Sequence, residues 1–146
     1  MNRALRVRDF MTTELHTVQP DAEIMDAVQR LVDLNVSSLL VVDAAGTLLG
    51  ILTERDCIDV ALQAGYFDEA GGAVRNFMKA PALTVAPDTS MMDLALTFAR
   101  SPLRRFPVLD GDRLVGLVSR RHVLRALVSG AWFARPGSAS KKGVGR

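Results

Sequence analysis

Apolar residues recur along the chain with helical spacing in some stretches and in short extended runs in others. After Pro20 and Asp21, apolar side chains return every three or four residues, which predicts a helix with one buried face formed by Ile24, Ala27, Val28, Leu31 and Leu34. Two short apolar runs follow at residues 39–42 and 48–52, with a turn at 44–46, and this pattern predicts a β-hairpin. A closing helix is expected over about 54–64, with Gly65 as its C-cap.

The same order of elements occurs twice. VRDFM recurs as VRNFM, and TVxPD recurs unchanged, each 67 residues later. LLGILT recurs as LVGLVS, 66 residues later, because one turn is a residue shorter in the second copy. The matching segments are residues 7–11 and 74–78, 17–21 and 84–88, and 48–53 and 114–119. Such a duplication predicts two homologous units of about 60 residues, neither of them large enough to bury much core alone.

We therefore expect an α+β fold in which each repeat contributes a short sheet packed by two helices. The first repeat is assigned to residues 1–70 and the second to residues 71–130. Residues 131–146 are small, polar and basic, and are expected to form a mobile tail. In each repeat an aspartate, Asp21 or Asp88, is expected to cap the first helix.

Composition adds a soluble, reducing context. The chain has 146 residues, of which 49% are hydrophobic and 23% charged, as in an ordinary globular domain. No stretch approaches the roughly 18 consecutive apolar residues of a membrane span, and the first residues do not resemble a signal peptide. Cys57 is the single cysteine, so it has no partner for an internal disulfide. These features favour a cytoplasmic location without membrane contact.

The net charge of +2 hides an uneven distribution. Residues 1–73 hold 5 basic and 12 acidic side chains, whereas residues 74–146 hold 13 basic and 4 acidic ones. A basic half can attract an anion, a nucleic acid or its own acidic partner half, and the last of these explains most of the asymmetry. Aromatic interleaving is sparse, with one Trp and one Tyr, which argues against nucleic-acid binding.

The repeat resembles the CBS (cystathionine beta-synthase) domain family. The resemblance covers residues 7–130 and rests on VRDFM, on TVxPD, on the hairpin and above all on GILTERD at 50–56, in the same order twice. It implies a pseudo-two-fold sandwich of two units with two clefts, and assembly of such pairs into homodimeric discs. Family members bind AMP, ADP, ATP, S-adenosylmethionine or NAD-type ligands and regulate a fused or partner protein. For this chain no cofactor is expected to be required.

The first candidate cleft contains residues suited to an adenosine nucleotide. Asp56 has two carboxylate oxygens, which can accept hydrogen bonds from both ribose hydroxyls, and Thr53 lies three residues before it. In the family pattern this pair holds the ribose, while Thr17, Val18 and Ala22 line the adenine pocket. The same pattern brings Arg104 and Arg105 of the other repeat to the phosphates, a role that suits guanidinium groups.

Each of these assignments has a plainer alternative. Thr53 and Asp56 have the spacing of a capping box, in which both side chains serve only the helix start, and the two roles can coexist. Arg104 and Arg105 can also be a solvated surface pair, or partners of the acidic first half. If the clefts are vestigial, the chain is a structural dimerisation module.

The second cleft departs from the pattern. His122 stands where the ribose-binding aspartate belongs, and Ser119 replaces the threonine. A neutral imidazole has one donor and one acceptor, so it accepts poorly from two hydroxyls. With Thr84 and Val85 this cleft is expected to be degraded, which leaves one competent site per chain.

Other chemistry is not indicated. His16, Cys57 and His122 lack metal-ligand spacing, and no catalytic triad, glycine-rich phosphate loop or pair of catalytic carboxylates is present. We therefore expect a non-enzymatic protein that acts on a separate, unknown partner. A homodimer is expected, with a contact surface on the closing helix and just beyond it, formed by Val60, Ala61, Leu62, Tyr66 and Phe67.

Overall fold

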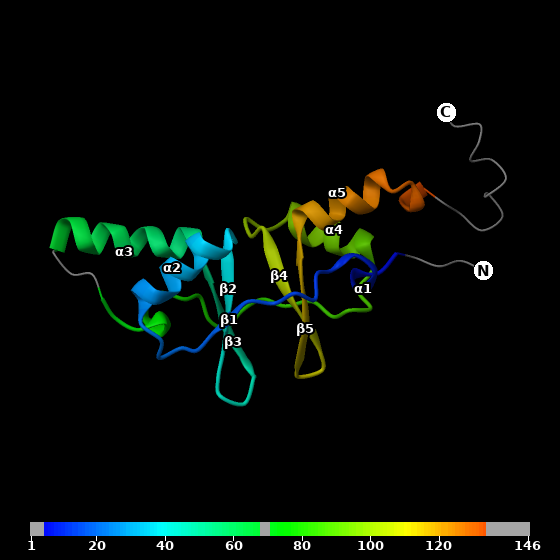
Figure 1. Cartoon of the computed structure of the whole chain (residues 1–146). Coiled ribbons are helices and arrows are strands. Elements are labelled where there is room, and N and C mark those ends of the chain that lie inside the picture. Colours follow the sequence, from blue (N-terminus) through cyan, green and yellow to red (C-terminus); the bar gives the residue numbers. More distant parts are fainter. Residues whose placement is uncertain (1–4, 68–70, 134–146) are drawn as a thin grey trace. The chain divides into compact units, whose positions relative to one another are not determined.

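The computed structural model describes residues 5–67 and 71–133 (Figure 1). The chain divides into two compact units. One unit comprises residues 14–83 and 112–114 and is called the first-repeat unit here. The remainder, residues up to 13, 84–111 and from 115 onward, forms the second-repeat unit.

The first-repeat unit is a three-stranded sheet covered by two helices. Strand β2 lies in the middle, parallel to β1 and antiparallel to β3. Figure 1 shows α2 and α3 side by side, and α2 contacts β2 while α3 contacts β3. The elements are β1 (Thr17–Val18), α2 (Ile24–Leu34), β2 (Ser38–Val42), β3 (Leu48–Thr53), α3 (Glu54–Phe67) and the 3₁₀ turn η1 (Val74–Asn76).

The predicted helix face of this unit is mostly confirmed. Ile24, Ala27 and Leu31 of α2 are buried in a core with Leu39, Val41 and Leu52 of the hairpin. Leu34 was expected in the same face but is 40% exposed. The helix ends directly after it, at Asn35, which adopts the left-handed conformation of a C-cap.

Three predicted helix boundaries are wrong. Helix α2 begins at Ile24 with Glu23 at the N-cap, and α4 begins at Met91 with Ser90 at the N-cap, so Asp21 and Asp88 lie two residues before these caps. The Ser90 side chain accepts the cap hydrogen bond from the Asp93 N–H at 3.0 Å. Helix α3 continues through Gly65 to Phe67.

The second-repeat unit has a two-stranded antiparallel hairpin, β4–β5, with helices packed around its own core. Trp132 packs against this core. Residues 134–146, including most of the expected tail, lie outside the described residues. The elements are α1 (Val7–Phe10), α4 (Met91–Ala99), β4 (Arg105–Asp110), β5 (Arg113–Ser119), α5 (Arg120–Val128) and η2 (Ala131–Phe133).

Each repeat is completed by the segment that precedes the other repeat. The backbone of Arg6 bridges Ser90, and Thr12 bridges Leu117, so the VRDFM segment joins the second-repeat unit with Val7 fully buried in its core. In the same way VRNFM joins the first-repeat unit, where Val74 is fully buried. The compact units therefore cross the sequence repeats: residues 5–13 belong spatially with the second copy and residues 74–83 with the first.

Candidate functional site

Thr53 and Asp56 form a capping box at the junction of β3 and α3. Oδ2 of Asp56 accepts hydrogen bonds from the backbone N–H and the hydroxyl of Thr53, both at 2.9 Å. The Asp56 N–H donates to Oγ1 of Thr53 at 3.3 Å. The plainer reading of this motif is thus realised in the structure. Because the cap uses only Oδ2, Oδ1 is left for another partner.

That partner is Lys79, which the sequence analysis did not identify. Its Nζ donates to Oδ1 of Asp56 at 2.6 Å, and the Asp56 side chain is only 2% exposed. The Lys79 backbone is fixed on β3, because its N–H and C=O exchange hydrogen bonds with Ile51 at 2.9 and 3.0 Å. Lys79 occupies the position that Thr12 holds in the first copy. This change from a hydroxyl to a cation is the sequence feature that could have pointed to the contact.

The predicted adenine-pocket residues lie in the same unit as Thr53 and Asp56. In the sheet, Thr17 of β1 pairs with Leu40 of β2, and Thr53 of β3 pairs with Ser38 of β2. Thr17 and Thr53 therefore flank one strand, about two residues apart along it, or roughly 7 Å. Val18 is part of the hydrophobic core and Ala22 packs against it, so their side chains serve packing as well.

The Thr17 carbonyl accepts a hydrogen bond from a side chain of helix α2. Nη1 of Arg30, on α2, donates to this oxygen at 2.5 Å. The His16 carbonyl accepts from the Leu40 N–H at 2.9 Å. These contacts fix the backbone of β1 and limit which of its groups remain for a ligand.

Arg104 and Arg105 lie in the second-repeat unit. Arg104 is exposed, and its carbonyl accepts a hydrogen bond from the Arg120 N–H at 3.1 Å. Arg105 begins β4 and is half-buried. Their approach to a ligand at Asp56 stays a prediction.

Ser119 and His122 repeat the capping box in the second-repeat unit. Nδ1 of His122 accepts from the Ser119 N–H at 2.9 Å and lies 3.0 Å from the Ser119 hydroxyl. The neutral ring therefore carries its proton on Nε2. Burial, followed by the charge of Arg125, lowers the pKa of His122. Val85 bridges Val108 of β4, and Thr84 beside it is exposed.

The Cys57 thiol, potential metal ligands and helix length are three further features of the chain. Burial, with the Asp56 and Glu54 charges, raises the pKa of the Cys57 thiol to about 11, so Cys57 is a neutral thiol at physiological pH. Among the described residues, no group of three or more potential ligands could hold a metal ion. Within the same ranges, no helix combines the length and apolarity that a membrane crossing requires.

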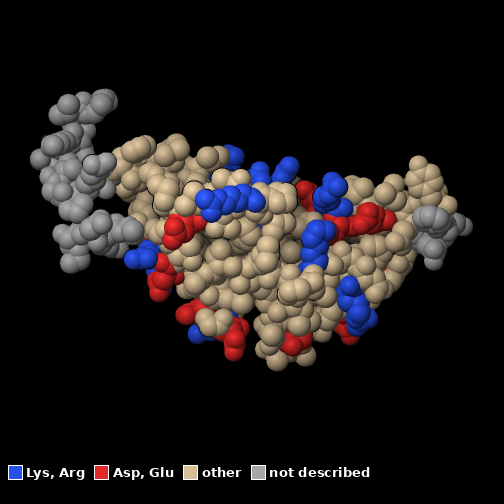
Figure 2. Space-filling model, turned by 180° about the vertical axis from the view of Figure 1, so that it is seen from behind, with Lys and Arg blue, Asp and Glu red and all other residues tan. Residues whose placement is uncertain are grey.

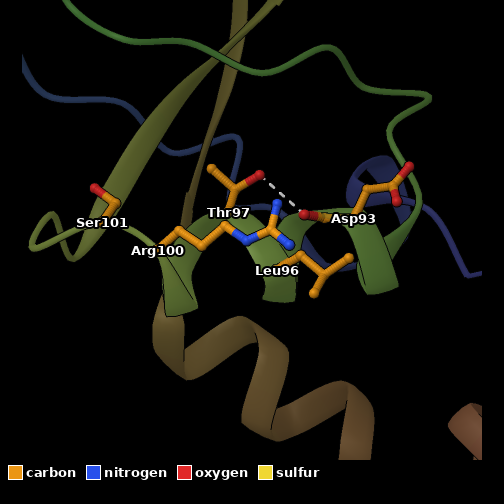
Figure 3. Close-up of a pocket in the computed structure, with 5 residues that line it drawn as sticks. All are labelled: Asp93, Leu96, Thr97, Arg100 and Ser101. Carbon is orange, nitrogen blue, oxygen red and sulfur yellow. Dashed lines mark hydrogen bonds between the residues drawn. The ribbon is translucent and has the colours of Figure 1, made fainter.

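A hollow lies on the second-repeat unit and is lined by none of the predicted site residues. It encloses about 470 Å³ and is lined by Asp93, Leu96, Thr97, Arg100 and Ser101. Figure 3 shows these residues along α4 and its C-terminal end, where the Thr97 hydroxyl donates a hydrogen bond to the Asp93 carbonyl. On the face shown in Figure 2, basic and acidic side chains are intermixed, and that face has no continuous basic surface.

Comparison with known proteins identifies the class to which this architecture belongs. The model of the CBS domain family matches the chain twice, over residues 7–63 and 74–129. The chain therefore belongs to the CBS domain family and carries two repeats of it, each with a small sheet and helices. This confirms the expected family and fold class.

Relatives and solved structures of similar architecture include proteins with adenosine ligands. The chain is 33% identical to CBS domain-containing protein YhcV of Bacillus subtilis, over 77% of this chain and 79% of the relative. It is 30% identical to chloroplastic CBSX2 of Arabidopsis thaliana, covering 86% of this chain but only 64% of that protein. The crystal structure of CBSX2 in complex with AMP superposes with a TM-score of 0.76, at 30% identity, over 86% of this chain and 97% of that one.

A second ligand class occurs in the CBS domain pair of protein MJ0100. Its crystal structure, in complex with 5-methylthioadenosine and S-adenosyl-L-methionine, superposes with a TM-score of 0.75 at 25% identity. The match covers 88% of this chain and 99% of that one.

Proposed function

We propose that the chain is a non-enzymatic regulatory module that binds an adenosine nucleotide of the AMP, ADP or ATP class and signals to a separate protein. The observation that carries the proposal is the position of Asp56. The capping box fixes its carboxylate rigidly through Oδ2, while Oδ1 is not needed by the helix. A fixed, buried acceptor of this kind suits the hydroxyls of a ribose.

The related proteins support the ligand class. CBSX2 holds AMP, and MJ0100 holds two adenosine derivatives that lack a phosphate group. The part shared by all three ligands is adenine with a ribose ring and its two hydroxyls, for which Thr17, Val18, Ala22, Thr53 and Asp56 are the proposed contacts. Arg104 and Arg105 are the proposed phosphate contacts, which favours AMP, ADP or ATP over S-adenosylmethionine, a ligand without a phosphate group.

Calorimetry with AMP and an Asp56→Ala variant tests the ribose contact. A hydrogen bond to a charged group contributes about 1.5–3 kcal/mol, so the variant should bind AMP about ten- to a hundredfold more weakly. The matched control is Asp59→Asn, on the exposed side of the same helix, which should bind as the wild type does. Unchanged affinity in a folded Asp56→Ala protein would leave Asp56 as a helix cap only.

The phosphate contact has its own test. Replacing Arg104 and Arg105 together by alanine should weaken the binding of ATP and AMP more than that of adenosine. Added salt should weaken ATP binding to the wild type, because it screens the guanidinium charges. Equal losses for all three ligands would assign the two arginines to another role.

A structural dimerisation module is the second candidate, and the apolar surface of α3 favours it. Ile58, Leu62 and Tyr66 are exposed at intervals of four residues along this helix. This surface is compatible with ligand binding, so dimerisation is the only function of the chain only if no adenosine compound binds. A thermal-shift panel of AMP, ATP, S-adenosylmethionine and NAD decides, since ligand at a hundredfold excess over Kd adds about 2.7 kcal/mol of stability.

A further inference from the structure

The contact between Lys79 and Asp56 has a consequence for any ligand that uses the carboxylate. Thr53 donates twice to Oδ2, so Oδ1 is the oxygen left for a ribose hydroxyl. Lys79 Nζ lies 2.6 Å from this same oxygen. The carboxylate is 2% exposed with the lysine in place, whereas the Lys79 side chain itself is 60% exposed.

These numbers describe an unequal pair. Asp56 is immobilised by its helix cap, and the Lys79 backbone is immobilised by its two hydrogen bonds to Ile51. The long Lys79 side chain is the mobile part, because most of it faces water and its ammonium can be solvated there at little cost. A ribose hydroxyl can therefore reach Oδ1 by displacing the ammonium.

We propose that Lys79 is an affinity- and specificity-determining residue that competes with the ribose hydroxyls of the ligand for Oδ1 of Asp56. This inference rests on the proposed adenosine site. Competition lowers affinity for every ligand that has these hydroxyls and leaves affinity unchanged for one that lacks them. Lys79 thus sets the concentration range over which the site responds.

The central experiment combines Lys79→Met with removal of the hydroxyls. Methionine keeps the apolar stem and removes the ammonium. AMP should bind the variant about three- to tenfold more tightly, since an ion pair with one exposed partner is a modest competitor. 2′,3′-Dideoxy-AMP should bind both proteins equally. Lys79→Arg, which keeps a cation, should behave as the wild type, and Arg75→Met removes a charge from the same segment as a matched control.

A second measurement follows the lysine itself. The sequence has three lysines, Lys79, Lys141 and Lys142. Acetic anhydride should acetylate the Lys79 amine faster when AMP is present, because displacement releases it from the carboxylate. The other two lysines serve as internal references in the same mass spectra.

The outcomes separate this inference from the proposed function. If the wild type binds AMP and Lys79→Met binds it equally or more weakly, the competition is wrong while the adenosine site stands. Protection of Lys79 from acetylation by AMP would likewise overturn it, since the lysine would then contact the ligand. If neither protein binds AMP, adenosine or the dideoxy compound, the proposed function fails and the inference fails with it.

Discussion

The carbonyl oxygen of Lys79 lies directly against Gly50, so closely that a Cβ at position 50 would overlap it. This approach lets Lys79 pair with Ile51 of β3 and brings the Lys79 side chain to Asp56. Gly116 occupies the equivalent place in the second copy, where a Cβ would overlap Met11. Gly50 is thus explained by a close approach of backbone to backbone, whereas a Cβ at Gly116 would first meet the side-chain sulfur of Met11.

We expect Gly50→Ala to destabilise the protein by about 1–3 kcal/mol, because the added methyl meets the carbonyl oxygen of Lys79, a residue whose backbone is held by two hydrogen bonds to Ile51. Gly65→Ala is the matched control, since Gly65 lies within α3 with open space around it. That change should stabilise the helix by about 0.5–1 kcal/mol. Urea unfolding measures both, and a Gly50→Ala protein as stable as the wild type would contradict the account.

A second prediction concerns pH and His122. Burial and the Arg125 charge lower the pKa of His122 in the folded protein from its usual 6.5. Below pH 6.5 the unfolded chain therefore binds more protons than the folded one, so stability falls as pH falls through this window and is restored above it. Protonation also removes the Nδ1 acceptor that Ser119 uses.

Unfolding free energies measured between pH 5 and pH 7.5 check this prediction. His122→Asn keeps an acceptor for the cap but does not titrate, so its stability should depend less steeply on pH than that of the wild type. Parallel slopes for the wild type and His122→Asn would show that the cap does not carry the dependence.

The duplication made the elements predictable, but not which core each segment joins. Two copies of one pattern, each with helical and extended periods, identified the order of helix, hairpin and helix. Sequence similarity shows which segments of the two repeats are equivalent. It does not show that residues 5–13 and 74–83 are exchanged between the units, because this exchange depends on chain direction and packing. Val7 and Val74 look identical in their motifs, and only the structure assigns each to the other copy's core.

The candidate site was predictable only in part, for the same reason. Thr53 and Asp56 are three residues apart, so their capping contact could be read from spacing. Lys79 lies 23 residues from Asp56 and reaches it through the exchanged segment, so no local pattern indicates the pair. The helix starts were misplaced because Asp21 and Asp88 suit an N-cap in type, whereas Glu23 and Ser90 hold the position.

A third prediction corrects and tests the expected homodimer surface. Val60 was included in it, but Val60 is 4% exposed and belongs to the core of the first-repeat unit, and the side chain of Phe67 lies outside the described residues. Ile58, Leu62 and Tyr66 are 59%, 47% and 80% exposed, and their spacing places them on one face of α3. We expect this face to be buried in a dimer or larger assembly.

Light scattering at micromolar concentration tests the assembly, for which a chain of 15.8 kDa should give at least twice that mass. Leu62→Glu should shift the mass toward the monomer, because a charge in an apolar contact is costly. Gln63→Glu adds the same charge beside the row and should leave the mass unchanged. A monomeric wild-type protein would contradict the predicted assembly.

The last prediction is that each chain binds one adenosine ligand, at Asp56 and not at His122. In the first-repeat unit the cap leaves Oδ1 as an acceptor for ribose, in competition with Lys79. In the second-repeat unit the cap consumes Nδ1 of His122, and the remaining ring nitrogen is a donor, so the imidazole has no acceptor left for ribose.

Calorimetric titration of the wild type with adenosine should therefore saturate at one ligand per chain. His122→Asp supplies the missing carboxylate within an existing capping box and should raise the stoichiometry toward two; adenosine is the right probe because it needs no phosphate contact. Two sites in the wild type, or loss of the single site on His122→Asp with Asp56 intact, would place the ligand in the second-repeat unit.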